Sequence, residues 1–392
     1  MNKLHRPLAL VALIGFSFPF STPAQAGGYV ETDLVVNKRV GAVPTLVDSH
    51  GVTHIAQFFD PNLVNPWGIG ESSGSPFWIS DNNAGVSTLY NTPGMPQGLV
   101  VSIPSLADLL GTGGAPTGVV SNTARGQGAF QISGVDISGN PITAPAFFLF
   151  ATEDGTILGW NPNVNPVGFD PAKAGTYATL VVNNSPGAVY KGLAIATDTG
   201  GTTRLYAANF RAGTVDVFDT SFQPVISVNA FVDPNLPRGY APFNIVPISM
   251  NGTTRMFVTY AVQDANKHDD VAGQSHGIVN KFHLDGSMPQ RFAQHGQFNS
   301  PWGVTLAPAG FGALGGSLWI GNFRNGHIDA YNPVTGEFID KVRDSHGQAI
   351  VIDGLWSIKF GNGGNGGLAN TLYFTAGTNG EQDGLFGSLA PQ

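Results

Sequence analysis

The sequence predicts an all-β protein, a six-bladed β-propeller of four-stranded antiparallel blades, and three observations support this. Glycine (53 residues) and proline (27 residues) are abundant while charged residues make up only 11%, which favours short strands and tight turns over helices. Short runs of β-branched and aromatic residues recur between Gly, Asn and Pro. These runs fall into six similar copies, each about the size of one propeller blade.

The clearest copy lies near the C-terminal end of the chain. It reads SPWGV at 300–304, GSLWIGNF at 316–323, RNGHIDAYNP at 324–333 and EFIDKV at 337–342. Four such segments predict one small antiparallel sheet. Because a single sheet cannot cover its own apolar faces, we expect the copies to stack around an axis, which also leaves few exposed edges.

The other copies share one position in their opening strand, and this position fixes the alignment. It holds Gly68, Gly118, Gly192, Asn244, Gly303 and Ser357. No linker or shift in composition divides the array, so we predict a single propeller domain over residues 64–390.

Residues 1–26 have the pattern of a secretory signal peptide. The basic start MNKLHR precedes the apolar run PLALVALIGFSFPF, and the small-residue site Ala24-Gln25-Ala26 follows. This run is too short to predict a membrane span. We therefore expect cleavage after Ala26 and a secreted or periplasmic mature protein.

Residues 27–63 form an N-terminal segment with two predicted strands, VETDLVV at 30–36 and THIAQFF at 53–59. The last copy ends at GLFGSL (384–389) and leaves no room for a fourth strand. We therefore expect an N-terminal strand to close the last blade. The alternative is a leader that lies outside the fold.

Charge and cysteine content exclude several classes of function. Loss of Lys3 and Arg6 with the signal peptide would take the net charge from −8 to about −10, which argues against nucleic acid and anionic membranes as partners. The absence of cysteine excludes disulfides, thiolate nucleophiles and cysteine-bound metals. We expect a monomer.

Two textual motifs do not predict chemistry. Residues 70–74 fit the G-x-S-x-G pattern of a nucleophile elbow, and residues 361–366 fit G-x-G-x-x-G. Both motifs require a following helix, whereas here strand-like sequence follows. We interpret both as loops.

The turn between the second and third strands of each copy should lie beside the start of the innermost strand, around the mouth of the central channel. A polar, concave mouth is a natural place to bind a small molecule. Asn and Asp are also what tight turns require, so turn chemistry is the competing explanation. The predicted ligand-binding residues are Glu153, Lys191, Arg211, Asn244 and Arg324, within a ring that also holds Asp81, Asn82, Asp154, Asn209, Asn322, Glu381 and Asp383. For Lys191, the alternative is a structural salt bridge to a carboxylate across the channel.

The longest break within a copy, Val262–His276, is the densest polar window of the chain. Its Asp264 and His268, together with Asn65 from the first inner strand, are the predicted metal ligands. Carboxylate and imidazole groups can bind Zn²⁺, and oxygen donors can bind Ca²⁺. No spacing matches a known metal motif, so a solvated loop is the alternative. Trp67, Trp302 and Trp356 are expected to pack between blades.

Several longer segments together resemble a conserved hypothetical family of exported six-bladed propellers, associated with bacteria that sort proteins by an exosortase (PEP-CTERM) signal. The segments are DPNLVNPWGI (60–69), ATEDGTILGWNP (151–162), VYKGLAIA (189–196), NFRAGTVDVFD (209–219), RGYAPFNI (238–245), SPWGVTLAPAGFG (300–312), IDGLW (352–356) and the ending YFTAG to GLFG. The resemblance implies membership of the superfamily of NHL-repeat and TolB-like propellers, and it implies no activity.

Two functions follow from this sequence. The first is a binding or scaffold module that presents the central-channel face to a small ligand, a glycan or a protein. The second is a metal-dependent hydrolase or lyase of the lactonase type, with Ca²⁺ or Zn²⁺ at the axis as a Lewis acid. Fold alone does not choose between them. Convergence of oxygen donors from Asn65, Glu153, Asn244 and Asp264 at the axis would favour the second.

Overall fold

The structure is a computed structural model that describes residues 27–392, and the predicted signal peptide lies outside the described residues. Within this range the chain is almost entirely β, with 29 strands, four 3-10 helices of three residues each and one four-residue α-helix, α1 (Thr378–Glu381). The expected all-β composition is confirmed. Among these residues no helix has the length and apolar character needed to cross a membrane.

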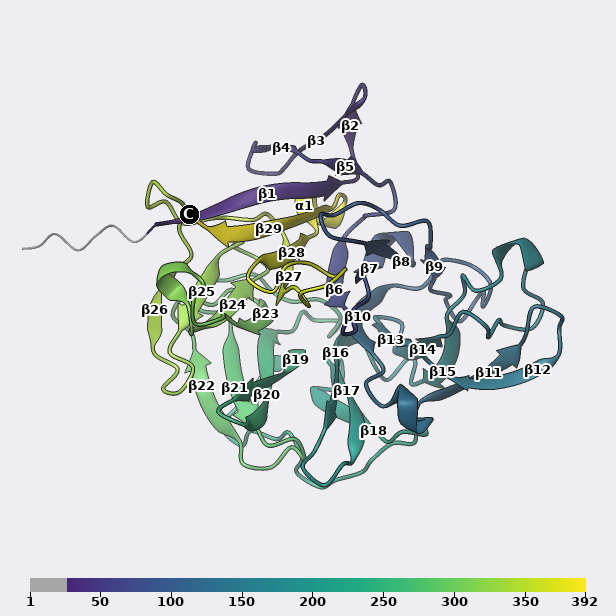
Figure 1. Ribbon diagram of the computed structural model, residues 1–392. Coiled ribbons are helices and arrows are strands. Elements are labelled where there is room, and N and C mark those ends of the chain that lie inside the picture. Colours follow the sequence, from purple (N-terminus) through teal and green to yellow (C-terminus); the bar gives the residue numbers. More distant parts are fainter. Residues whose placement is uncertain (1–26) are drawn as a thin grey trace, which may run out of the picture.

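Six sheets surround a common axis in the described part of the chain (Figure 1). The first contains β6 (Pro66–Gly70), β7 (Phe77–Asp81), β8 (Val86–Tyr90) and β9 (Val101–Ser102), and the second β10 (Pro116–Ser121), β13 (Phe148–Thr152), β14 (Thr156–Trp160) and β15 (Thr179–Asn183). The third contains β16 (Tyr190–Thr197), β17 (Thr203–Asn209) and β18 (Thr214–Phe218), and the fourth β19 (Tyr240–Met250), β20 (Thr253–Val262), β21 (Ile278–Phe282) and β22 (Gln290–Gln294). The fifth contains β23 (Pro301–Leu306), β24 (Leu318–Asn322), β25 (Ile328–Tyr331) and β26 (Phe338–Lys341), and the sixth β27 (Leu355–Phe360), β28 (Leu372–Ala376), β29 (Leu385–Pro391), β1 (Tyr29–Val36) and β5 (Phe58–Phe59).

The first strand of each sheet is the innermost. β6, β10, β16, β19, β23 and β27 each contact the inner strand of the next sheet, and β27 contacts β6. This arrangement is that of a β-propeller.

The repeated position of the inner strands is explained by their close approach at the axis. A Cβ atom on Gly68 would lie 2.6 Å from the carbonyl oxygen of Thr117, and one on Gly118 would lie 2.4 Å from the backbone nitrogen of Leu193. Real Cβ atoms do not come so close to neighbouring backbone, so the first sheets tolerate only glycine there. The glycines found by the sequence alignment therefore mark where adjacent sheets meet.

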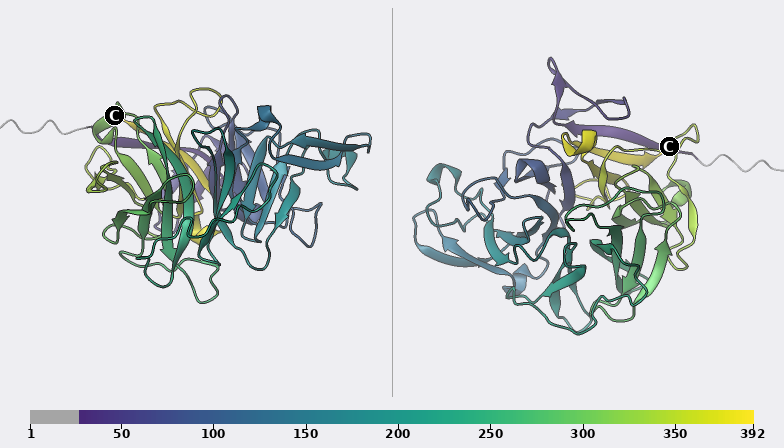
Figure 2. Two further views of the ribbon diagram at one scale, coloured as in Figure 1. Left: turned by 90° about the horizontal axis from the view of Figure 1, so that it is seen from below. Right: turned by 180° about the vertical axis from the view of Figure 1, so that it is seen from behind.

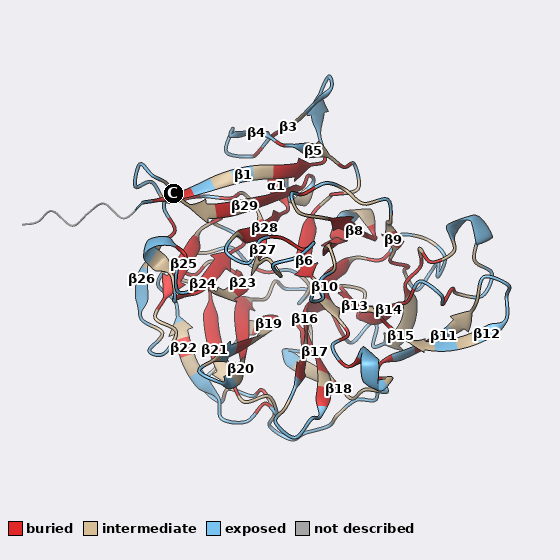
Figure 3. Cartoon of the chain, in the orientation of Figure 1, coloured by how far each residue is buried: buried red, intermediate tan, exposed pale blue. Residues whose placement is uncertain are grey.

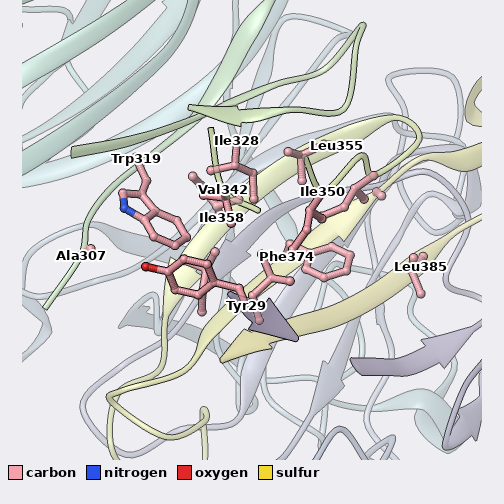
Figure 4. Close-up of a cluster of buried hydrophobic side chains, with 14 of the residues drawn as sticks. Tyr29, Ala307, Trp319, Ile328, Val342, Ile350, Leu355, Ile358, Phe374 and Leu385 are labelled. Carbon is pink, nitrogen blue, oxygen red and sulfur yellow. The ribbon is translucent and has the colours of Figure 1, made fainter. Parts of the chain in front are cut away.

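The N-terminal strand β1 pairs with the C-terminal strand β29 in antiparallel register from Tyr29 opposite Pro391 to Val36 opposite Leu385. Figure 1 shows β1 beside β29, so the two ends of the chain share one sheet. Figure 4 shows the apolar cluster that this pairing creates, in which Tyr29 packs against Trp319 with ring centroids 5.2 Å apart.

The third sheet differs from the prediction of four-stranded blades, because it has three strands within the described residues. The chain after β18 contains Pro224, Pro234 and Pro237. Proline has no N–H for a strand ladder, so this segment runs as turns instead of a fourth strand.

Two insertions project from the ring (Figure 2). One is the hairpin of β11 (Gln131–Val135) and β12 (Pro141–Pro145). The other is the three-stranded sheet of β2 (Arg39–Val40), β3 (Val43–Val47) and β4 (Thr53–Ile55), which we call the N-terminal sheet. In Figure 3 the strands of the ring are mostly buried, whereas the N-terminal sheet is largely exposed.

Candidate functional site

The turns between second and third strands lie beside the starts of the inner strands, as expected. Asn82 donates its backbone N–H to the carbonyl of Asn65 at 3.0 Å, and Phe323 donates to the carbonyl of Ser300 at 3.0 Å. We call this side of the ring the turn face.

Several polar residues of the turn face stabilise their own hairpins. The side-chain amide of Asn209 donates to Asp216 at 2.9 Å, and that of Asn322 donates to Asp329 at 2.8 Å, seven residues on in both cases. In the first sheet Asp81 accepts a hydrogen bond from the Thr88 hydroxyl at 2.7 Å. These residues have a structural role, which agrees with the turn-chemistry explanation.

Lys191 is the buried charge at the centre of the turn face. It lies at the start of β16, its side chain is only 2% exposed, and its ammonium group contacts carboxylates of Glu153 and, at 3.2 Å, Asp269. The three residues belong to three different sheets. Burial alone would lower the pKa of Lys191, but Glu153 and Asp269 outweigh it, so the pKa lies above its ordinary value and the ammonium stays charged.

Amide side chains extend this group around the mouth. Asn82 donates to the second oxygen of Glu153 at 2.9 Å, and Asn65 donates to Glu381 at 2.9 Å. Asn65 also approaches Asn82, at 3.4 Å between amide nitrogen and oxygen. We call Glu153, Lys191, Asp269, Asn82, Asn65 and Glu381 the turn-face network.

Glu381 is a half-buried acid in this network. Burial, and then the nearby Glu153 carboxylate, raise its pKa, while Arg324 and the Asn65 hydrogen bond oppose the shift. Arg324 donates two hydrogen bonds of 2.8 Å to the carboxylate of buried Asp270. This bidentate geometry is the strong form of an arginine–carboxylate pair.

The loop between β20 and β21 brings His268 into the same region. His268 Nδ1 lies 2.9 Å from Asp269 Oδ1, and one donor atom each of Glu153, His268 and Asp269 lie within 4.8 Å of one another. Asp264 does not reach this group, since its carboxylate accepts the backbone N–H of His268 at 2.8 Å and so shapes the loop.

Beneath the turn-face network the axis is filled by aromatic side chains. Trp67 stacks on Trp356 at 3.5 Å between ring centroids, Phe323 stacks on the same ring at 3.8 Å, and Trp302 packs edge-on. The tryptophans therefore pack between sheets, as predicted, and they also meet one another at the axis.

A cavity of about 320 Å³ lies on the other side of this aromatic cluster. It is lined by the C-terminal halves of the inner strands β6, β10, β16, β19, β23 and β27. Glu71 and Lys359, which form an ion pair of 3.5 Å, are among its lining residues.

The structure brings Glu153, Lys191, Arg324, Asn65 and His268 together at the mouth. The other predicted residues lie apart from it. Arg211 donates to the carbonyl of Pro186 at 3.0 Å, and Asn244 donates to the carbonyl of Trp302 at 2.8 Å. Asp264 accepts a hydrogen bond from within its own loop. The four oxygen donors expected for an axial metal therefore do not converge.

The sequence places Asp269 and Asp270 in the polar window 262–276, but the acid predicted to act from that window was Asp264. Nothing in the spacing shows which acid reaches Lys191, since that depends on how the loop of the fourth sheet folds back over the third.

Two further groups in the described residues could hold a metal by composition and distance. One consists of Glu31, Asp33 and His54, and the other of Asp48, His50 and Asp353. Both lie where the N-terminal sheet meets the ring.

Comparison with known proteins places this β-propeller among relatives of unassigned activity. The chain is 30% identical over 351 residues to uncharacterized protein R648 of Acanthamoeba polyphaga mimivirus, covering 86% of this chain and 77% of the relative. It is 32% identical over 349 residues to uncharacterized protein L690 of the same virus, covering 86% and 82%. The chain belongs to the family of these two proteins. No family model matches.

Solved structures of similar shape are distant. The virginiamycin B lyase of Staphylococcus aureus aligns with a TM-score of 0.45 and 13% identity, covering 84% of this chain and 96% of the lyase. A glucose dehydrogenase aligns with a TM-score of 0.47 and 12% identity, covering 84% and 98%. At these values the likeness assigns no activity to this chain.

Proposed function

We propose that this protein is an exported six-bladed propeller that binds a small, hydroxyl-rich ligand, such as a glycan, on its turn face. The six sheets are its blades, and β1 closes the last of them. The proposal depends chiefly on one observation, the buried ammonium of Lys191 between Glu153 and Asp269.

A buried cluster of charges is a poor way to stabilise a fold, because well-packed apolar residues of similar size are often as stable or more so. Perturbed ionisable groups gather instead at functional sites. The ammonium group of Lys191 positions two carboxylates from other blades at the channel mouth. This arrangement supports a binding role for the mouth.

The chemistry of the accessible atoms favours a ligand rich in hydroxyl groups. Asp269, whose side chain is 60% exposed, offers acceptors, and His268, 38% exposed, lies beside it. Arg324 adds donors nearby. Because a sugar hydroxyl both donates and accepts, it can use neighbouring carboxylate and cationic groups together.

A metal-dependent hydrolase or lyase is the second candidate, since Glu153, His268 and Asp269 place three donor atoms within 4.8 Å of one another. Lys191 opposes it, because the ammonium contacts two of the three residues and would repel a divalent cation. A metal there would require Lys191 to move away.

An oligosaccharide array followed by calorimetry tests the proposal, using residues 27–392 purified without a histidine tag. We expect a saccharide to bind the wild type and to bind Asp269→Asn at least tenfold more weakly. Asp136→Asn, on the β11–β12 hairpin, is the matched control and should bind as the wild type does. Circular dichroism checks that each variant is folded.

Absence of saccharide binding, or equal binding by Asp269→Asn, would contradict the glycan proposal. Stoichiometric Ca²⁺ or Zn²⁺ lost in Asp269→Asn would favour the metal-dependent alternative, and a screen of lactones and esters would follow.

We also propose export, a monomeric state and kinship with the exosortase-associated family. Intact mass of the secreted protein should match a chain that starts at Gly27. Light scattering should give the mass of one chain. A mass that retains residues 1–26 would contradict cleavage after Ala26.

A further inference from the structure

A second group of ionisable side chains lies where the N-terminal sheet meets β1. Glu31 and Asp33 are two residues apart on β1, and His54 comes from β4. One donor atom of each lies within 4.8 Å of the others. With Asp48, which follows β3, we call this group the N-terminal cluster.

Both ring nitrogens of His54 lie near carboxylates. Its Nδ1 lies 3.0 Å from Asp33 Oδ1, and its Nε2 lies 3.5 Å from Asp48 Oδ2. The His54 side chain is only 7% exposed. One ring nitrogen therefore faces the carboxylates of β1, and the other faces a separate carboxylate.

Asp48 is a rigid support for this imidazole. Its side chain is 2% exposed, and its Oδ1 accepts the backbone N–H groups of His50 at 3.0 Å and Val52 at 2.8 Å. A histidine that binds a metal through one nitrogen usually donates its other N–H to a carboxylate or carbonyl, which fixes the ring. The Asp48–His54 pair has this form.

The side chain of Glu31 gives independent evidence that this cluster can bind a cation. Its Oε1 is buried and accepts no hydrogen bond from any described residue. The three carboxylates of the cluster face His54, and Asp48 Oδ2 also lies 3.9 Å from His50 Nδ1, but among the described residues no Lys or Arg forms an ion pair with any of them. A buried carboxylate oxygen normally has a hydrogen-bond or cationic partner, so Glu31 Oε1 is free to bind a cation.

We propose that Glu31, Asp33 and His54 bind one divalent transition-metal ion, for which Zn²⁺ is the best match, while Asp48 orients His54. One nitrogen and two carboxylate oxygens are accepted zinc ligands, and solvent can complete the coordination.

The Asp33–His54 distance needs little change to admit the ion, and the Glu31 carboxylate, within 4.8 Å of both, would move in to bind it. Two donors on one tetrahedral zinc, with bonds of about 2.0–2.2 Å, lie roughly 3.3 Å apart. The Asp33–His54 pair at 3.0 Å needs to open by only a few tenths of an ångström. The ion would join β4 to β1 and so fix the N-terminal sheet on the ring.

A metal-free cluster explains the same residues differently. Burial alone would lower the pKa of His54, but Asp33 and Glu31 raise it to about 9, and burial together with Asp33 raises the pKa of Glu31 to about 7. Protons on both residues would then supply the positive charge. Direct measurement of metal binding separates the two explanations.

The test is calorimetric titration of EDTA-treated residues 27–392 with ZnCl₂ at pH 7.5, with MnCl₂ and CaCl₂ titrated in parallel. We expect one Zn²⁺ per chain with micromolar or tighter affinity. At a free concentration of about 100 times Kd, Zn²⁺ should raise Tm by about 3 °C. Elemental analysis of the untreated protein checks the stoichiometry.

Glu31→Gln and His54→Gln should each weaken Zn²⁺ binding at least tenfold and abolish the rise in Tm. Two controls should keep both. His50→Ala removes an exposed histidine on the other side of Asp48, and Asp269→Asn alters the turn-face network. Far-ultraviolet circular dichroism confirms that the variants fold.

The proposal is overturned if no divalent ion binds stoichiometrically, or if Glu31→Gln and His54→Gln bind Zn²⁺ as tightly as the wild type. Loss of binding in His50→Ala alone would place the ion between Asp48, His50 and Asp353 instead. Loss in Asp269→Asn alone would place it at the turn face. Stoichiometric binding of Ca²⁺ without Zn²⁺ would contradict a transition-metal site.

Discussion

The turn-face network and the N-terminal cluster contain the same three kinds of side chain but differ in their cation. Each brings a glutamate, an aspartate and a histidine within 4.8 Å. At the turn face Lys191 lies among them and contacts two carboxylates. At the N-terminal cluster His54 is the only side chain that forms ion pairs with Asp33, among the described residues.

The binding preference of a set of potential metal ligands depends as much on the charges beside it as on the ligands themselves. A lysine in the site neutralises the carboxylates permanently and leaves their remaining lone pairs for hydrogen bonds. Without a lysine, neutralisation must come from protons or from an ion in solution. One site therefore favours a polar ligand, and the other favours a metal.

Removal of Lys191 should give the largest effect. Lys191→Met leaves Glu153 and Asp269 without their cation, so we expect the free energy of unfolding to fall by about 3–5 kcal/mol, measured by urea denaturation. The variant should also gain a second Zn²⁺ site in calorimetry, because its turn face would then resemble the N-terminal cluster.

A double variant makes that prediction specific. Lys191→Met combined with Glu153→Gln removes one of the unpaired charges, so it should recover part of the lost stability and lose the new metal site. Equal stability of the wild type and Lys191→Met would show that the buried ion pair does not stabilise the fold. That result would contradict the proposed difference between the turn-face network and the N-terminal cluster.

Asp329 is intermediate between the two sites, because Lys341 lies at the upper distance limit of an ion pair with it. Lys341 Nζ lies 4.0 Å from this fully buried carboxylate, and burial raises the pKa of Asp329 to about 6, although Lys341 and Asn322 oppose the shift. An acid whose pKa is higher in the folded state holds its proton more tightly when folded. This residue should therefore cost stability progressively as the pH rises from about 4 through 6, by up to about 3 kcal/mol.

Urea denaturation between pH 4 and pH 8 measures this effect. Asp329→Asn cannot ionise, so its stability should fall less steeply over that range than that of the wild type. Identical slopes for the two proteins would mean that Lys341 neutralises Asp329 fully, as Lys191 does its partners.

Two arginines at equivalent turn positions give the smallest predicted difference. Arg324→Ala leaves buried Asp270 without its bidentate partner, so we expect a loss of about 2–3 kcal/mol. Among the described residues the Arg211 side chain donates only to the carbonyl of Pro186, so Arg211→Ala should change stability by less than about 0.5 kcal/mol. Thermal denaturation of both variants measures the contrast, and equal losses would contradict it.

Much of the ring of sheets was predictable because the sequence patterns that specify its strands and turns are local. Strand and turn preferences act over a few residues, and repetition of the pattern locates every inner strand, including the glycines at positions 68 and 118. The pairing of β1 with β29 followed from a missing strand in the last copy. In the N-terminal sheet, β4 lies within the strand predicted at 53–59, whereas β2, of two residues, is too short to show alternation.

The candidate sites were only partly predictable, because their contacts join residues far apart in the chain. The all-β composition, the place of Lys191 at the start of an inner strand and the polarity of the turn face could be predicted from residues close together in the chain. The folded structure was needed to show that Asp269 reaches Lys191 across 78 residues and that His54 lies between Asp33 and Asp48. Turn and strand preferences depend on neighbours in sequence, whereas the partner of a charge depends on which sheets adjoin and how the loops between their strands fold over them.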